Sequence, residues 1–152
     1  MAITFRYKLM EYEDGGKFHV PKIPIVIEGN KQQLVMGLLD SGATNSFIPR
    51  SLANYIELEI NESEEHNITT VGQKVPGHTS EMRIIVEGPR QKRYTAKIPV
   101  IVLEDEDLDE IIIGRTGFFN LFRITFHENE KIVVLKPYPE GNLEIGRSRG
   151  FS

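Results

Sequence analysis

The 152-residue chain contains no cysteine, which excludes disulfide bonds, thiolate metal sites and cysteine nucleophiles. It also lacks any apolar run of about 20 residues, the length that a membrane-spanning helix needs. Its first residues lack even the shorter apolar run of a signal peptide. From these absences we expect a soluble, cytoplasmic protein with no membrane contact.

The chain also has no excess of positive charge. Its formal net charge is -4, and the densest basic cluster is Arg90, Lys92 and Arg93 beside Tyr94. Nucleic-acid-binding proteins usually carry a basic stripe interleaved with aromatic residues, so we expect no nucleic-acid partner. Hydrophobic residues make up 39% of the chain and charged residues 26%. This composition and length are typical of one globular domain.

Acidic residues concentrate in the stretch 104–110, which reads EDEDLDE. Asp105, Asp107 and Asp109 alternate as they would in a calcium loop. The glycine at the sixth position and the glutamate at the twelfth that a helix-loop-helix calcium site requires are missing. The four histidines show no metal-ligand spacing. We therefore predict a solvated loop here, and neither a metal nor a cofactor.

Short or alternating apolar runs separated by turn residues dominate the chain, a pattern typical of β-strands. The predicted strands are 3–9, 23–29, 33–39, 66–71, 81–88, 94–103, 110–114, 121–128 and 131–137. A hairpin is predicted around Gly29-Asn30, and Gly77 is a predicted break between strands. Helical signals are limited to 51–58, with Ser51 as a candidate N-cap, and to 115–122. We predict an all-β domain over 1–136 and a flexible tail over 137–152.

The stretch LLDSGATNSFIPR, Leu38 to Arg50, places Asp40 between an apolar run and a small Ser-Gly-Ala turn. A carboxylate at the end of a buried strand is costly unless it is hydrogen-bonded or functional. This stretch resembles the active-site loop of aspartic proteases, and especially that of the retropepsin-like branch. Three segments are similar to further parts of that family in order and spacing. They are the hairpin leading into the catalytic loop, 23–44, the flap hairpin, 69–84, and the closing signature DEIIIGRTGFF, 109–119.

The resemblance implies a retropepsin-like closed or partly closed barrel with one or two short helices, acting as an aspartic endopeptidase on peptide or protein substrates. In this class two aspartates share a proton: one activates water while the other donates to the scissile carbonyl. The chain has one Asp-Ser-Gly and is too short to hold a second lobe. The resemblance therefore implies a homodimer with one Asp40 from each protomer. The alternative is a catalytically silent peptide-binding or dimerisation module with the same fold.

The resemblance also implies roles for the residues around Asp40. Ser41 would make a hydrogen bond across the dimer and fix the two catalytic loops. Gly42 would let the chain turn and the substrate approach closely, and Ala43 would keep the wall of the site small. The closing signature contains Ile112, Ile113, Gly114 and Arg115. Its isoleucines, from Ile111 onward, would pack beneath the loop, and its glycine would permit close backbone passage.

The flap, a hairpin that closes over bound peptide, would contain Gly72, Gln73, Lys74, Val75, Pro76 and Gly77. Two features depart from the retroviral pattern. Thr44 stands where retroviral enzymes often carry an acid that pairs with the arginine of the closing signature, so Arg115 lacks that partner. The flap is also less glycine-rich than the retroviral one, and we interpret His78 beside its tip as an exposed turn histidine.

Overall fold

The structure is a computed structural model, which describes residues 1–70, 72–105, 107–139 and 143–147. Strands dominate it, so the expectation of an all-β protein is confirmed. The strands are β1 (Ile3–Arg6), β2 (Lys8–Glu11), β3 (Lys17–Val20), β4 (Lys22–Glu28), β5 (Gln32–Leu39), β6 (Phe47–Pro49), β7 (His66–Thr70), β8 (Gln73–Glu87), β9 (Lys92–Leu103), β10 (Ile111–Ile113), β11 (Phe122–His127), β12 (Ile132–Pro137) and β13 (Glu144–Arg147). The helical elements are α1 (Arg50–Tyr55) and two short 3-10 helices, η1 (Pro89–Gln91) and η2 (Phe118–Asn120).

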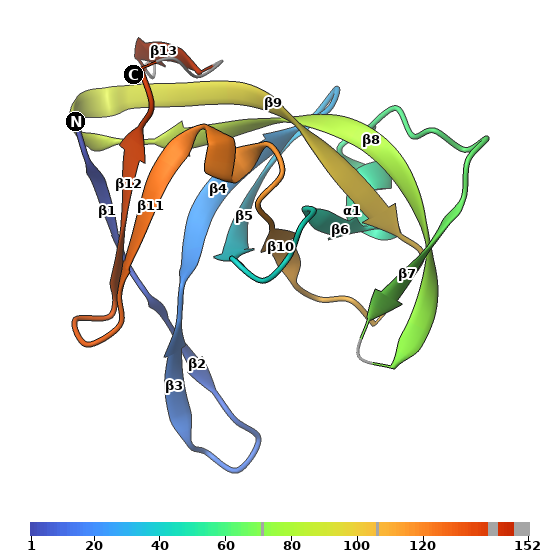
Figure 1. The fold of residues 1–152 in the computed structure, drawn as a ribbon, viewed down its shortest axis with the longest axis horizontal. Helices are drawn as coiled ribbons and strands as arrows, with labels where there is room; N and C mark the ends of the chain where they lie inside the picture. Colours follow the sequence, from blue (N-terminus) through green and yellow to red (C-terminus); the bar gives the residue numbers. More distant parts are fainter. Residues whose placement is uncertain (71, 106, 140–142, 148–152) are drawn as a thin grey trace.

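One eight-stranded sheet forms most of the molecule, in the order β13-β9-β6-β10-β5-β4-β8-β7 (Figure 1). Strand β8 also pairs with β9, so the sheet returns on itself as a partial ring. A three-stranded sheet, β1-β12-β11, and the small hairpin of β2 and β3 complete the fold. Strand β10 lies between β5, its parallel neighbour, and β6, its antiparallel neighbour. This arrangement places β10, which is distant in sequence, between the two strands that flank the loop 40–46.

The core follows from alternation along the strands, because successive side chains of a strand point to opposite faces. In β4, Ile23, Ile25 and Ile27 are fully buried, whereas Pro24 between them is exposed. Phe118 of η2 packs against Phe122 of β11 with ring centroids 5.1 Å apart. Burial of such large apolar side chains contributes roughly 1.5–3 kcal/mol each relative to leaving them in water. The isoleucine-rich strands therefore stabilise the centre of the sheet, where β10 lies between β5 and β6.

Two local predictions were right in kind but not in detail. The hairpin around Gly29-Asn30 is confirmed, since β4 and β5 pair antiparallel from Lys22↔Leu38 to Glu28↔Gln32. Helix α1 (Arg50–Tyr55) overlaps the predicted 51–58 region but begins one residue earlier, with Pro49 as its N-cap residue and no side-chain cap. Ser51 as N-cap was therefore wrong, because the extended Pro49 that ends β6 already starts the helix.

The predicted break at Gly77 was also wrong. Strand β8 runs without interruption from Gln73 to Glu87, and Gly77 pairs with His66 of β7 and Leu103 of β9. Its φ is not positive, and a Cβ there would lie 2.9 Å from Ile101 Cγ2, so the glycine serves close packing within the sheet. His78, expected in an exposed turn, lies in the same strand and is only 7% exposed.

The end of the chain contains a strand that was not predicted. Strand β13 pairs antiparallel with β9, from Glu144↔Thr95 to Arg147↔Lys92. The flexible tail over 137–152, and with it the limit of the domain at 136, stays a prediction. Residues 140–142 and 148–152 of that tail lie outside the described residues.

Candidate active site

Asp40 follows directly after β5, at the place where β5 and β10 run side by side. Leu39 is the partner of Ile113 in the parallel ladder, and the Asp40 N–H donates to the Ile113 carbonyl at 3.0 Å. The Leu39 N–H donates to the Pro21 carbonyl, also at 3.0 Å. Both Leu39 and Ile113 are buried, with 2% and 0% of their surface exposed. The backbone that carries the carboxylate is thus held by core strands.

The chain turns immediately after Asp40. The Gly42 N–H donates to Asp40 Oδ1 at 2.9 Å, and the Ala43 N–H donates to the Asp40 carbonyl at 3.2 Å. A Cβ on Gly42 would lie 3.2 Å from Oδ1, tighter than most real contacts. Asp40 and Ala43 are half-buried, whereas Ser41 and Gly42 are exposed. The carboxylate is therefore both hydrogen-bonded and reachable from solvent, which suits a reacting group.

The closing signature contacts this loop through its backbone. The Arg115 N–H donates to the Ala43 carbonyl at 2.9 Å. A Cβ on Gly114 would lie 2.2 Å from the Asn45 carbonyl oxygen and 2.9 Å from that of Ala43. Backbone atoms at such distances cannot give way as a flexible side chain can. The two segments thus cross so closely that only glycine fits at position 114.

The side chain of Arg115 has a different partner from the retroviral one. Its Nη2 donates to Thr44 Oγ1 at 3.2 Å, and the Thr116 N–H donates to the Thr44 carbonyl at 2.8 Å. The arginine therefore reaches the position four residues after the aspartate, as the spacing of the retroviral pair implies. The contact is made to a neutral hydroxyl group, so it contributes less than a bond between two charges.

Ser46 is a structural residue of the site that sequence reasoning missed. It is fully buried, its Oγ accepts a hydrogen bond from the Gly114 N–H at 3.1 Å, and its carbonyl accepts one from the Ile101 N–H at 2.9 Å. A buried hydroxyl of this kind is expected to be hydrogen-bonded. The sequence offers one signal, a small polar residue directly before the apolar strand β6. Its partner 68 residues away has no local signature.

The segment assigned to the flap forms a hairpin, but its tip lies closer to the N-terminus than predicted. Strand β7 pairs with β8 from His66↔Gly77 to Thr70↔Gln73, and Gly72 in the turn has φ +78°. Gln73, Lys74, Val75, Pro76 and Gly77 occupy the start of β8, where Val75 and Gly77 are buried and Lys74 is exposed. In Figure 1 strands β7 and β8 of the hairpin lie at the right of the view, and the loop after β5 lies near its middle.

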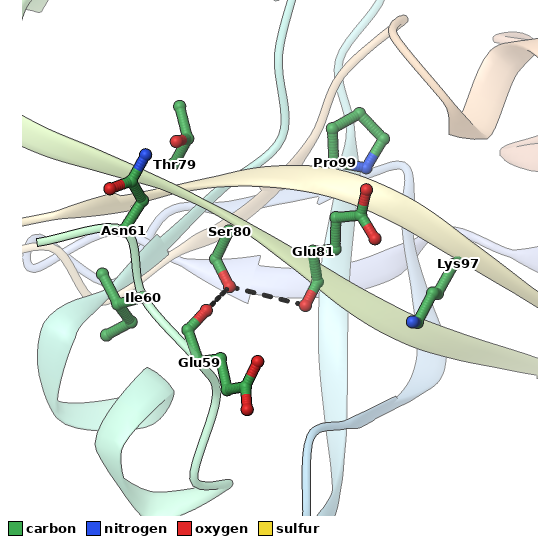
Figure 2. Close-up of a pocket in the computed structure, with 8 residues that line it drawn as sticks. All are labelled: Glu59, Ile60, Asn61, Thr79, Ser80, Glu81, Lys97 and Pro99. Atoms are coloured by element: carbon green, nitrogen blue, oxygen red, sulfur yellow. Dashed lines mark hydrogen bonds between the residues drawn. The ribbon is translucent and has the colours of Figure 1, made fainter. Parts of the chain in front are cut away.

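One hollow in the surface lies away from Asp40. It has a volume of about 600 Å³ and is lined by Glu59, Ile60, Asn61, Thr79, Ser80, Glu81, Lys97 and Pro99 (Figure 2). A hollow of this size could hold a ligand, but the accessible, hydrogen-bonded carboxylate that peptide hydrolysis needs is that of Asp40. We therefore place the candidate active site at Asp40. Within the residues described, no cluster of three acidic or histidine side chains could hold a metal ion. The same residues include no helix long and apolar enough to span a membrane.

The comparisons with known proteins agree with this geometry. The sequence matches a protein family described as "Aspartyl protease" over residues 23–116, more than half of the chain, including Asp40 and residues 109–116 of the closing signature. Among solved structures, the chain is similar to a retropepsin-like aspartic protease from Rickettsia conorii, with 15% identity over 89% of this chain and 90% of that one, at a TM-score of 0.54. It is also similar to the retroviral protease-like domain of Ddi1 from Leishmania major, with 17% identity over 81% of this chain and 97% of that one, at a TM-score of 0.51. Among curated protein sequences, none matches significantly. The structural likeness confirms the retropepsin-like fold.

Proposed function

Because this chain belongs to the aspartyl protease family, we propose that it is a homodimeric aspartic endopeptidase, in which each protomer contributes one Asp40 to a shared catalytic dyad. The observation that carries the proposal is the state of the Asp40 carboxylate. It is held by a backbone N–H at 2.9 Å, at the end of a core strand, and it stays accessible to solvent.

The proposed chemistry needs two carboxylates that share one proton. The ionised carboxylate removes a proton from water, which attacks the scissile carbonyl, while the protonated partner donates its proton to the carbonyl oxygen. Like charges a few Å apart cannot both ionise cheaply, so the two groups titrate separately. In this arrangement the Gly42 N–H stabilises Oδ1 of Asp40, and the second oxygen is available to water and to the shared proton.

In this proposal the second carboxylate comes from another copy of the chain, since these 152 residues contain one Asp-Ser-Gly. The exposure of Ser41 and Gly42 at the surface of the loop is compatible with a partner docking there. In the proposed dimer, Ser41 bonds to the loop of the other protomer and Ala43 lines the wall of the site. A two-fold axis beside the loop would bring the two Asp40 carboxylates together.

The β7–β8 hairpin is the proposed flap. Its turn contains Gly72 in the left-handed region, where residues other than glycine are strained. Strand β7 lies at the edge of the sheet, and no strand of the described residues pairs with its outer side. A hairpin with one free edge can close over a bound peptide and exclude water. Residues 72–77 would then supply the surface that meets the peptide.

Dilution tests the shared site. One protomer holds half of the dyad, so the peptidase activity per chain should fall as the protein is diluted through its dimer dissociation constant, measured by sedimentation. Activity per chain that stays constant far below that constant would contradict the shared site. A pepstatin-type inhibitor separates the enzyme from the silent module, because transition-state mimics bind far more tightly than substrate only where catalytic geometry exists. A dimer that binds peptide substrates but neither cleaves them nor binds the inhibitor would be the silent module.

A further inference from the structure

An ionic cluster lies at the base of the β7–β8 hairpin, outside the site described above. Its centre is Arg50, the first residue of α1. Arg50 Nε donates to Glu104 Oε1 at 2.7 Å, and Arg50 Nη2 donates to Glu62 Oε2 at 3.1 Å. Nη2 also contacts Glu104, and Nη1 contacts Glu62. One guanidinium group thus makes paired hydrogen bonds to two carboxylates, a geometry that a planar arginine can supply and a lysine cannot.

The two carboxylates belong to opposite sides of the hairpin base. Glu62 lies in the segment between α1 and β7, which leads into the first strand of the hairpin. Glu104 follows β9, and its N–H donates to the carbonyl of Pro76 in β8 at 2.9 Å, so it is attached to the second strand. Arg50 therefore connects the chain on both sides of the hairpin. Its guanidinium group is the one that bonds to a carboxylate on each side.

The entering segment is attached to β8 at further points below the cluster. His78 Nδ1 lies 2.9 Å from the Glu64 carbonyl oxygen, and His78 Nε2 lies 3.6 Å from Glu104 Oε1. Ser80 Oγ donates to the Glu59 carbonyl, as Figure 2 shows, and Ile60 forms an isolated bridge with Ser80. These contacts end at residues 78–80 of β8. Toward the tip, the two strands of the hairpin pair with one another.

The pKa values of Arg50 and Glu62 reflect these hydrogen bonds at a solvent-accessible place. Hydrogen bonds to Glu62 and Glu104 raise the pKa of Arg50, and the hydrogen bond from Arg50 lowers the pKa of Glu62. The side chains of Arg50, Glu104 and Glu62 are 25%, 32% and 60% exposed. Solvent screens such a cluster, so it stabilises the hairpin base less than a buried contact would.

We propose that Arg50 is a positioning residue that holds the base of the β7–β8 hairpin in place while the tip moves over the substrate. Its effect on catalysis rests on the proposed function. The contacts of Arg50 with Glu62 and Glu104, called the clamp below, exist without substrate. A flap that pivots on a loose base would close in many orientations. A base fixed by one side chain limits the movement to the strands beyond it, which is the requirement for a hinge.

Hydrogen exchange on the full chain tests the clamp directly. The variants are Arg50→Gln, Arg50→Lys and Arg83→Gln. Arg83 is the matched control, because it also lies against two glutamates, at 3.3 Å from Glu28 and 3.9 Å from Glu144, but farther along β8 from the tip. In Arg50→Gln we expect amides of 66–77 to exchange about three- to tenfold faster, and those of β5 and β10 to stay unchanged. Arg50→Lys should lie between this variant and the wild type, and Arg83→Gln should leave the hairpin unchanged.

Three results would overturn the proposal: unchanged hairpin exchange in Arg50→Gln, equal acceleration in β5 and β10, or the same acceleration in Arg83→Gln. If Arg50→Gln does not fold, Glu62→Gln removes one arm of the clamp at a 60% exposed side chain. It should accelerate exchange in the same residues, and no acceleration there would equally overturn the clamp.

Peptide cleavage tests the catalytic part. Arg50→Gln should raise KM about threefold or more, with a smaller change in kcat and the same melting temperature as Arg83→Gln. An unchanged KM in an active enzyme would overturn the positioning role. If the wild type cleaves no peptide, the proposed function fails, while hydrogen exchange still decides whether Arg50 clamps the hairpin.

Discussion

The loop of Asp40 and the β7–β8 hairpin are held by different kinds of interaction. The loop is held by backbone groups and buried side chains: the Asp40 N–H bonds to Ile113, and the fully buried Ser46 bonds to Gly114. The hairpin is held at its base by the partly exposed Arg50 cluster together with His78, and among the described residues the outer side of β7 is unpaired. Buried contacts cost much to break and are insensitive to salt, whereas exposed ionic contacts are weak and screened.

This difference matches what each region has to do in the proposed enzyme. A carboxylate that shares a proton with a partner must be held within a fraction of an ångström, which favours rigid supporting strands. A flap must open for each substrate, so it should belong to the least stable part of the fold. Breaking contacts in the two regions should therefore have unequal effects on the free energy of unfolding.

The largest effect on stability is expected for Gly114→Ala. The added Cβ would lie 2.2 Å from the Asn45 carbonyl oxygen, so the crossing segments would have to separate. We expect a loss of about 3 kcal/mol in the free energy of unfolding, measured by urea denaturation. Gly146→Ala is the control, since a Cβ there meets nothing within 4 Å. Equal midpoints for the two variants would show that the crossing is not tight.

A smaller loss is expected for Ser46→Ala. The substitution leaves the Gly114 N–H without its acceptor inside the core, which costs about 1–3 kcal/mol. Ser63→Ala removes a hydroxyl that bonds to Asn61 Oδ1 at 2.7 Å on the surface, and it should change stability by less than about 0.5 kcal/mol. If both variants unfold at the same urea concentration, the buried hydrogen bond does not support the loop.

In the hairpin, Gly72→Ala should lower the free energy of unfolding by about 1 kcal/mol, because φ at this position is +78°. The space around a Cβ is open, so backbone strain is the one expected cause. Gly72→Asn is the control, since asparagine tolerates the left-handed region better than alanine. We expect faster amide exchange near the tip in Gly72→Ala, and a smaller change in Gly72→Asn. Should the two variants behave alike, backbone conformation does not govern the tip.

The smallest effect concerns the titration of Glu62. The hydrogen bond from Arg50 lowers the pKa of Glu62. The contact therefore stabilises the hairpin base at pH values above the ordinary pKa of a glutamate, and this stabilisation is lost as the pH falls through the lowered pKa. In Arg50→Gln the pKa should return toward its ordinary value. Carbon-13 NMR titration of the Glu62 carboxyl group measures its pKa in the wild type and in the variant. Identical titration curves in wild type and variant would exclude the contact in solution.

The sequence predicted those parts of the fold whose signal is local. Alternation in 23–39 predicted the hairpin of β4 and β5, and the family pattern around Asp40 predicted the retropepsin-like fold. The failures at Gly77 and His78 share one cause. Strand β8 is continued by its pairing with β9, a contact between distant residues that overrides the local signal of Gly77 for a break.

The Arg50 cluster was missed for a similar reason. Its partners lie 12 and 54 residues away in the sequence, and an arginine after a proline carries no sign of either. The acidic run of 104–110 was interpreted as a solvated loop, which gave Glu104 no individual role. Side-chain contacts between separate elements become visible only when the sheet order is known.

Peptide hydrolysis by Asp40→Asn tests the central claim most directly. Asp14→Asn is a matched control, because Asp14 Oδ1 accepts from the Gly16 N–H at 2.8 Å, the same local contact that Asp40 makes with Gly42 at 2.9 Å. The proposed dyad predicts that Asp40→Asn abolishes cleavage while it folds and dimerises, since an amide cannot accept and return the proton. Asp14→Asn should cleave at the wild-type rate. A folded Asp40→Asn dimer that still cleaves peptide would contradict the assignment of Asp40 and the proposed function with it.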